Sequence, residues 1–188
     1  MSHLLTGEVF GQLFTSFERT ARRLEARDHY DIAEEDDQVG GFATGQLDEA
    51  DHRAYMADWM GMVRSARAAG KRFERVRIVP AVLTNYLRLE LRGNRYNAEA
   101  GEDIRYLDRD RANALDLPDH DFWLFDDERL ALQYFTASGR PLGALVVADP
   151  AVVSQHAAWL DRAWTEATPY ADYLAEDPSR EHPAGRGG

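Results

Sequence analysis

Apolar residues recur every three or four positions in three long stretches of the chain, residues 6–27, 55–66 and 83–91. This spacing is typical of helices that bury one face. We expect the second helix to end near Gly70 and the third at Gly93-Asn94, because glycine and asparagine are common just beyond a helix. The pattern therefore predicts three amphipathic helices in the first half of the chain.

The closing helix has a distinct start signal. Asp149 is followed by Pro150, which are favoured types at the N-cap and at the first helical position. We expect this helix to stop before Pro169, and a shorter helix to cover residues 109–115. The acidic run and glycines of residues 34–45 predict a turn and loop instead.

Short apolar runs between turn residues predict the strands. The expected strands lie near Tyr30 and Ile32, then at residues 73–79, 104–107, 122–125, 130–135 and 143–147. The last three follow one another with only turn residues between them, which is typical of an antiparallel meander. In the run 121–126 both faces are apolar, as in a central strand that is covered on both sides.

These elements predict an α+β fold, in which helices pack on a mixed or antiparallel sheet. The chain has 188 residues, a length that suits one domain. We expect that domain to span residues 1–175. Residues 176–188 are polar and rich in glycine and proline, so we expect a disordered tail.

The net charge of −11 is unevenly distributed. Residues 31–58 contain nine acidic side chains and one basic one, whereas residues 60–95 contain nine basic and two acidic ones. Two solvated faces that pair with each other would explain this pattern. The alternative is a basic groove for an anionic ligand. Direct binding of nucleic acid is not expected, because the overall charge is strongly negative.

Several classes of protein lack support in the sequence. No apolar run is long enough to cross a membrane, and the first residues do not resemble a signal peptide. The chain has no cysteine, and its histidines and glycines form no metal, nucleotide or catalytic-serine motif. We therefore expect a cytoplasmic protein with no cofactor, no metal and no catalytic residues.

Five segments carry a resemblance that covers nearly the whole chain. They are RTARRLEARDHY (19–30), RVRIV (75–79), AGEDIRYL (100–107), DFWLFD (121–126) and the helix that begins at Asp149-Pro150. Together they are similar to an actinobacterial family, domain of unknown function 6879. Its members resemble partners of helix-turn-helix regulators. The resemblance therefore implies a partner rather than a reaction.

A weaker resemblance concerns the phospholipase D-type fold, of which the order of elements resembles one half. That superfamily carries His-x-Lys-x4-Asp, and here His120, Phe122 and Asp127 lie at the same spacing. Phe122 replaces the phosphate-binding lysine, and no second copy of the motif is present. Sugar-sensing transcriptional regulators resemble such a non-catalytic state. Their closing helix carries F-x3-W-x-x-A, to which Leu160, Trp164 and Ala167 are similar.

Strand alternation suggests where a ligand could bind. Arg77 lies between two positions that are expected to face the core, and Arg105 follows Glu102 and Asp103 at the start of the next strand. We predict that Arg77, Arg105 and Glu102 line a pocket. A purely structural pair of arginine and carboxylate is the alternative interpretation.

The run DFWLFDDE (121–128) and the histidine that precedes it add three further candidates for ligand binding, His120, Trp123 and Asp126. Core packing of this strand is the alternative interpretation. If the strand instead lines a binding site, we expect Trp123 to stack on the ligand. Together with the first three residues, these give six predicted binding residues.

We expect a non-catalytic regulatory or interaction module that acts with a helix-turn-helix regulator or a second copy of itself and binds an anionic ligand. The alternative is an enzyme, or a degenerate nuclease-like protein, acting on a phosphorylated or other anionic substrate. Trp164 falls outside the apolar stripe of the closing helix and is predicted to contact the partner. Burial of Trp164 within the chain is the alternative.

Overall fold

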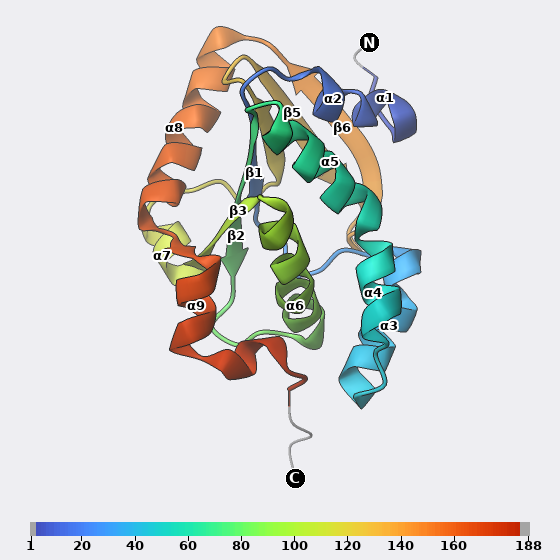
Figure 1. Cartoon of the computed structure of the whole chain (residues 1–188). Helices are drawn as coiled ribbons and strands as arrows, with labels where there is room; N and C mark the ends of the chain where they lie inside the picture. Colours follow the sequence, from blue (N-terminus) through green and yellow to red (C-terminus); the bar gives the residue numbers. More distant parts are fainter. Residues whose placement is uncertain (1–2, 185–188) are drawn as a thin grey trace.

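The computed structural model describes residues 3–184, and its central feature is a seven-stranded mixed sheet (Figure 1). The strands are β1 (Thr20–Glu25), β2 (Arg72–Val79), β3 (Asp103–Asp108), β4 (Phe122–Phe125), β5 (Arg129–Phe135), β6 (Pro141–Val147) and β7 (Thr168–Pro169). Their order across the sheet is β6-β5-β4-β1-β2-β3-β7. β1, β2 and β3 are parallel, whereas the other neighbouring pairs are antiparallel. This confirms the predicted fold class and the meander of β4, β5 and β6.

Helices cover both faces of this sheet (Figure 1). They are α1 (Gly7–Gly11), α2 (Leu13–Ser16), α3 (Ala33–Thr44), α4 (Glu49–Tyr55), α5 (Ala57–Ala68), α6 (Asn85–Ala100), α7 (Arg109–Ala114), α8 (Pro150–Glu166) and α9 (Tyr170–Glu176). Helix α8 lies across β1 to β5 on one face, with α7 beside it. Helices α5 and α6 cover the other face, and α3 and α4 pack against α6 at its outer side.

The two faces of the sheet contain different cores. On the α8 face the core is mostly aliphatic, with Leu24, Val76 and Ile78 at its centre. On the α5 face it is aromatic, with Phe14, Phe73, Trp59 and Trp123. The central strand β4 is buried along its whole length, as its two apolar faces predict.

The predicted helix over residues 6–27 is wrong. The chain forms α1 and α2, leaves the helical conformation at Phe17, and continues as strand β1. In β1, the strand alternation is concealed because its polar residues are buried too: Arg22 pairs with Glu74, and Arg23 pairs with Glu25. Burial of both apolar and ion-paired residues removes the alternation that identifies a strand.

The predicted loop at residues 34–45 is also wrong, because this segment forms α3, and the strand expected at Tyr30 and Ile32 is absent from the described residues. The acidic side chains lie in the first turn of α3, where they interact favourably with the helix dipole. Gly45, with a φ of 73°, ends the helix in the left-handed conformation that suits glycine.

Helix α6 runs beyond its predicted end and includes Gly93 and Asn94. At Gly93 a Cβ atom would lie 2.9 Å from Nε2 of His52, so the glycine permits the close approach of α4 to α6. The closing helix α8 begins and ends as predicted, with Asp149 accepting hydrogen bonds from Ala151 and Val152.

In the tail, Pro178–Glu181 form a 3-10 helix, and Arg88 of α6 donates a hydrogen bond to the carbonyl of Ser179 (2.8 Å). This part of the tail differs from the disorder that we predicted. Residues 185–188 of the predicted disordered tail lie outside the described residues.

Candidate ligand pocket

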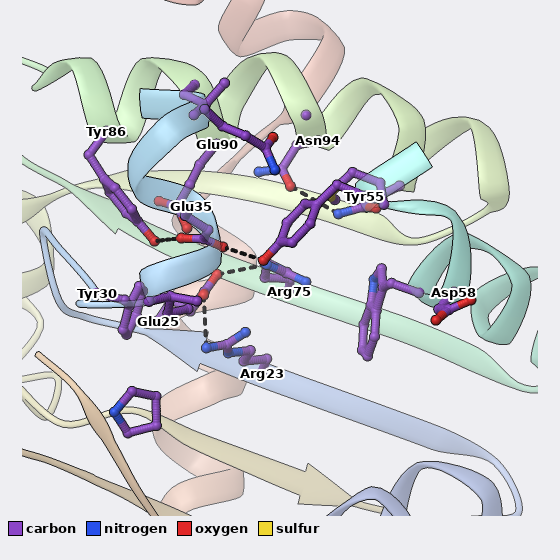
Figure 2. A pocket seen from close by; sticks show the side chains of 18 of the residues that line it. Arg23, Glu25, Tyr30, Glu35, Tyr55, Asp58, Arg75, Tyr86, Glu90 and Asn94 are labelled. Carbon is purple, nitrogen blue, oxygen red and sulfur yellow. Dashed lines mark hydrogen bonds and ion pairs between the residues drawn. The ribbon is translucent and has the colours of Figure 1, made fainter. Parts of the chain in front are cut away.

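A pocket of about 540 Å³ opens on the α5 face of the sheet (Figure 2). Its walls come from α3, α4, α5 and α6, and its floor comes from β1, β2, β4 and β5. The volume falls within the range that is typical of small-molecule sites.

Aromatic rings form one side of this pocket. Trp59 of α5 and Trp123 of β4 lie with their ring centroids 5.8 Å apart, and Phe14 contacts Trp123 edge-on at 4.9 Å. Each of the three lines the pocket. Such rings offer a large apolar surface together with π faces that attract cations.

The floor contains a chain of buried ion pairs. Arg75 binds two carboxylates: its Nε donates to Oε1 of Glu102 (2.7 Å), and its Nη1 donates to Oε2 of Glu25 (3.0 Å). Arg23 pairs with the other oxygen of Glu25 (2.9 Å), and Nε1 of Trp59 donates to Glu102 (2.9 Å). The parallel register places Arg23 of β1 beside Arg75 of β2. Both arginines therefore share the carboxylate of Glu25.

This arrangement sets the protonation state of Glu25. Burial alone would raise the pKa of Glu25, but the charges of Arg23, Arg75 and Arg77 outweigh that effect and lower it to about 2. Glu25 is therefore a carboxylate at neutral pH.

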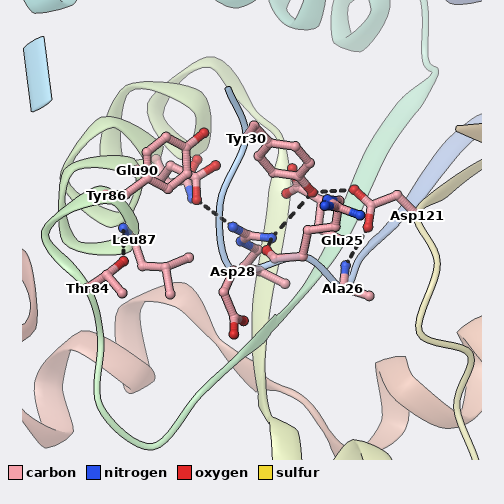
Figure 3. A network of polar contacts seen from close by, with 12 residues as sticks. Glu25, Ala26, Asp28, Tyr30, Thr84, Tyr86, Leu87, Glu90 and Asp121 are labelled. Carbon is pink, nitrogen blue, oxygen red and sulfur yellow. Dashed lines mark hydrogen bonds and ion pairs between the residues drawn. The ribbon is translucent and has the colours of Figure 1, made fainter. Parts of the chain in front are cut away.

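A second polar network, which includes Tyr30, Glu90 and Asp121, lies next to the pocket (Figure 3), and Arg77 contacts two of these residues. Arg77 is 2% exposed, and it donates to the carbonyl of Arg27 (2.6 Å) and to Oε2 of Glu90 (2.6 Å). Its Nη1 lies 3.4 Å from the hydroxyl of Tyr30, which in turn donates to Asp121. Burial is the main reason that the pKa of Tyr30 is raised, so Tyr30 keeps its proton.

Two carboxyl groups on the helical wall have raised pKa values. Burial raises the pKa of Glu90 to about 7, because the favourable charge of Arg77 is offset by the negative charges of Glu25 and Glu35. Burial also raises the pKa of Glu35, against the opposing effect of hydrogen bonds from Tyr86 (2.9 Å) and Tyr55 (3.1 Å). Figure 2 shows Glu35 between these two tyrosines.

The prediction that Arg77, Arg105 and Glu102 come together is wrong. Arg105 is paired in register with Val76, so its side chain projects to the α8 face, whereas Arg77 projects to the pocket face. Arg105 lies over the ring of Trp164 at 4.0 Å and donates to the carbonyl of Trp164. Arg77 and Glu102 both lie behind the pocket lining, as partners of Glu90 and Arg75.

Trp123 lines the pocket directly, whereas Asp126 does not. The carboxylate of Asp126 accepts hydrogen bonds from the backbone N–H groups of Glu18, Arg19 and Thr20. Burial would raise the pKa of Asp126, but these three hydrogen bonds lower it instead. Asp126 thus joins the end of β4 to the start of β1.

His120 lies near the opposite end of β4, at a separate pocket of about 380 Å³. Its Nε2 lies 3.1 Å from Nε2 of His156 on α8. Phe122 is fully buried, and Asp127 contacts Arg22 beyond the far end of the strand. The phospholipase-like spacing therefore does not bring His120 and Asp127 together, because a strand separates them.

Trp164, the predicted partner contact, is half-buried against the aliphatic core, where Arg105 covers its ring. No group of three or more potential metal ligands occurs among residues 3–184. In the same part of the chain, none of the helices combines the length and the apolar character that a membrane span requires.

Sequence reasoning missed most of the pocket lining. Arg23 and Glu25 were assigned to a helix, and Glu35 was assigned to a loop. A usable signal was present at Arg75 and Arg77, which alternate with Val76 and Ile78 on one strand. Strand β1 offers no such signal, because Arg22 and Arg23 are adjacent and nearly all of its residues are buried.

The comparisons with known proteins give one match. The family described as "Domain of unknown function (DUF6879)" matches residues 8–175, which include every described strand and the whole of helices α3 to α6. No curated protein matches the chain. The match covers most of the 188 residues, and the chain therefore belongs to the DUF6879 family.

Proposed function

We propose that this chain is a non-catalytic, cytoplasmic regulatory module that binds a small molecule in the pocket between the sheet and α3–α6. The observation that carries the proposal is the pocket itself, which combines aromatic walls with a floor of fully paired charges. Apolar walls with a few fixed polar groups are typical of small-molecule sites. We further propose that ligand binding changes how the chain associates with a helix-turn-helix regulator or with a second copy of the chain.

A pair of tyrosine variants tests ligand binding. Tyr55 and Tyr134 are both 43% exposed, but of these two only Tyr55 lines this pocket. A metabolite that raises the melting temperature of the native protein is expected to do so in Tyr134→Ala and to lose much of its effect in Tyr55→Ala. If Tyr55→Ala responds to every such metabolite as the native protein does, the pocket is not the binding site.

Glu90 supports a second candidate function, an enzyme. A carboxyl group that lines a pocket and has a pKa of about 7 can both accept and donate a proton at neutral pH. Glu90→Gln distinguishes the two candidates, since glutamine retains the shape but cannot transfer a proton. If a bound compound is converted by the native protein and not by Glu90→Gln, the chain is an enzyme. If it is recovered unchanged from both, the binding module is supported.

A further inference from the structure

The ionisable side chains that line the pocket have an excess of negative charge. Apart from His52 and three tyrosines, they comprise two arginines, Arg23 and Arg75, and four acidic residues, Glu25, Glu35, Asp58 and Glu90. Both arginines already bind carboxylates, and Arg23 also lies over the ring of Trp123 at 5.3 Å. The positive charge that would attract an anion is therefore already compensated within the protein.

The carboxylates of the helical wall are less well compensated. Glu35 accepts hydrogen bonds from the hydroxyl groups of Tyr86 and Tyr55, which are neutral donors. Glu90 has one cationic partner, Arg77, and the charge of Glu35 acts on Glu90 unfavourably. A cation between these two carboxyl groups would relieve that repulsion and would be desolvated only in part, since the pocket is open.

Unpartnered polar atoms also point to a ligand that donates hydrogen bonds. Asn97 is 1% exposed and lines the pocket, and its Oδ1 has no partner among the described residues. The same holds for Oε1 of Gln133 on the floor. Two further atoms of the lining are unpartnered among the described residues. Nε of Arg23 is a donor, but its guanidinium group already binds Glu25. Nε2 of His52 is an acceptor when the neutral ring donates from Nδ1 to Oε1 of Gln38. Three of these four unpartnered atoms are therefore hydrogen-bond acceptors, which a ligand that donates hydrogen bonds would satisfy.

We infer that the ligand is an organic cation, a primary or substituted amine attached to a flat apolar group. This inference rests on the proposed binding function. The ammonium group lies between Glu35 and Glu90, and the apolar group lies against Trp59 and Trp123. Charge-assisted hydrogen bonds and ring faces both favour a cation over a neutral analogue of the same shape.

Three probes of matched size test the charge of the ligand: 2-phenylethylamine, 2-phenylethanol and 3-phenylpropionate. Binding is followed at pH 8 by tryptophan fluorescence, because Trp59 and Trp123 line the pocket. The ligand efficiency of small compounds predicts a Kd of about 10 mM or below for the amine, so titrations extend to about 50 mM. We expect the amine to bind at least about tenfold more tightly than the alcohol, and the acid to bind least.

Two charge-matched variants locate the cation. Glu35→Gln is expected to weaken binding of the amine about tenfold and to leave binding of the alcohol unchanged. Glu34→Gln, on the same helix but exposed and outside the pocket lining, is expected to change neither. A melting curve for each variant shows that it is folded.

The outcomes separate the ligand class from the proposed function. Equal binding of amine and alcohol, or an unchanged amine affinity in Glu35→Gln, overturns the inferred cation and leaves the binding function standing. Tightest binding of the acid overturns it in favour of the anionic ligand that the sequence suggested. If none of the three probes binds, the inferred cation is overturned, whereas the proposed function is decided by the melting-temperature comparison of Tyr55→Ala with Tyr134→Ala.

Discussion

Strand β2 presents different kinds of side chain to the two faces of the sheet. On β2, Val76 and Ile78 face α8, whereas Arg75 and Arg77 face the pocket. All four are nearly inaccessible to solvent. One residue along the strand therefore separates an aliphatic core from a network of buried charges.

This difference indicates that the two faces serve different purposes. An aliphatic core is stabilised by non-directional burial and tolerates changes that conserve volume. A buried ion pair seldom stabilises a fold more than apolar residues of the same size would, because desolvation offsets the attraction. The charges of the pocket face are therefore consistent with the binding function proposed above, and a purely stabilising role does not account for them. The following substitutions test this contrast.

Arg75→Met is expected to have the largest effect. Methionine fills a similar volume but leaves Glu25 and Glu102 buried without the cation that both contact. Loss of one partner of a buried ion pair costs about 3–5 kcal/mol. Urea unfolding at pH 7 measures the change in the free energy of unfolding.

The matched control for Arg75→Met is Arg72→Met on the same strand. The side chain of Arg72 is 67% exposed, so its pair with Glu74 is screened by water and its loss costs less than about 1 kcal/mol. Equal stability of Arg75→Met and Arg72→Met would contradict the contrast between buried and exposed pairs.

Glu90→Gln should show an intermediate, pH-dependent effect. The pKa of Glu90 is raised to about 7 in the folded chain, from an ordinary value of 4.5, so folding favours its protonated form. The native protein therefore loses stability from this group as pH rises from 4.5 through 7. We expect the free energy of unfolding of Glu90→Gln to rise by about 1–2 kcal/mol relative to that of the native protein over that pH range.

For Glu25→Gln, in the same pocket, we expect the opposite pH dependence of stability. The pKa of Glu25 is lowered to about 2, so its stabilising contribution is present above pH 4.5 and is lost as pH falls towards 2. Glu25→Gln should therefore differ most from the native protein at neutral pH and least in acid. If the stability of the two variants changed with pH in the same way, the pKa values of Glu25 and Glu90 would not be shifted in opposite directions.

The contrast between the faces also explains what the sequence could predict. Strands β2 to β6, helices α5, α7 and α8, and the overall fold class follow from apolar periodicity and turn residues, because those elements bury one apolar face or two. Strand β1 does not follow, because its buried face towards the pocket carries Arg23 and Glu25. Hydropathy alone assigns such residues to solvent.

The site was less predictable than the fold for the same physical reason. Glu102 and Arg77 were identified as candidates from local charge, but their partners lie on β1 and α6, which are distant in the sequence. Glu35 reaches the pocket only because the acidic segment folds into α3. Which charges become buried depends on the register of β1 against β2, and no local pattern encodes it.

Ile78→Val should have a smaller effect on the aliphatic face. Removing one buried methylene group costs about 0.5–1.5 kcal/mol in a well-packed core. Binding of 2-phenylethylamine should not change, since Ile78 faces α8 and lies outside the pocket lining. Val82→Ala is the control, because Val82 is 79% exposed and should change stability by less than about 0.5 kcal/mol. A change in amine affinity in Ile78→Val would show that the two faces are coupled.

The smallest effect is expected at the contact between His120, which precedes β4, and His156 of α8. Burial, and then the proximity of His156, lowers the pKa of His120 from its ordinary 6.5, so folding favours neutral His120. Its contribution to stability is therefore fully present above pH 6.5 and is lost as pH falls below that value. His120→Gln retains a polar group but cannot become charged, so its stability should decline less steeply than that of the native protein between pH 6.5 and pH 5. Urea unfolding of both proteins across this range measures the difference, with pH 8 as the reference at which His120 is neutral. A steeper decline of stability in His120→Gln would contradict this prediction, and it would mean that protonation of His120 stabilises the contact between β4 and α8.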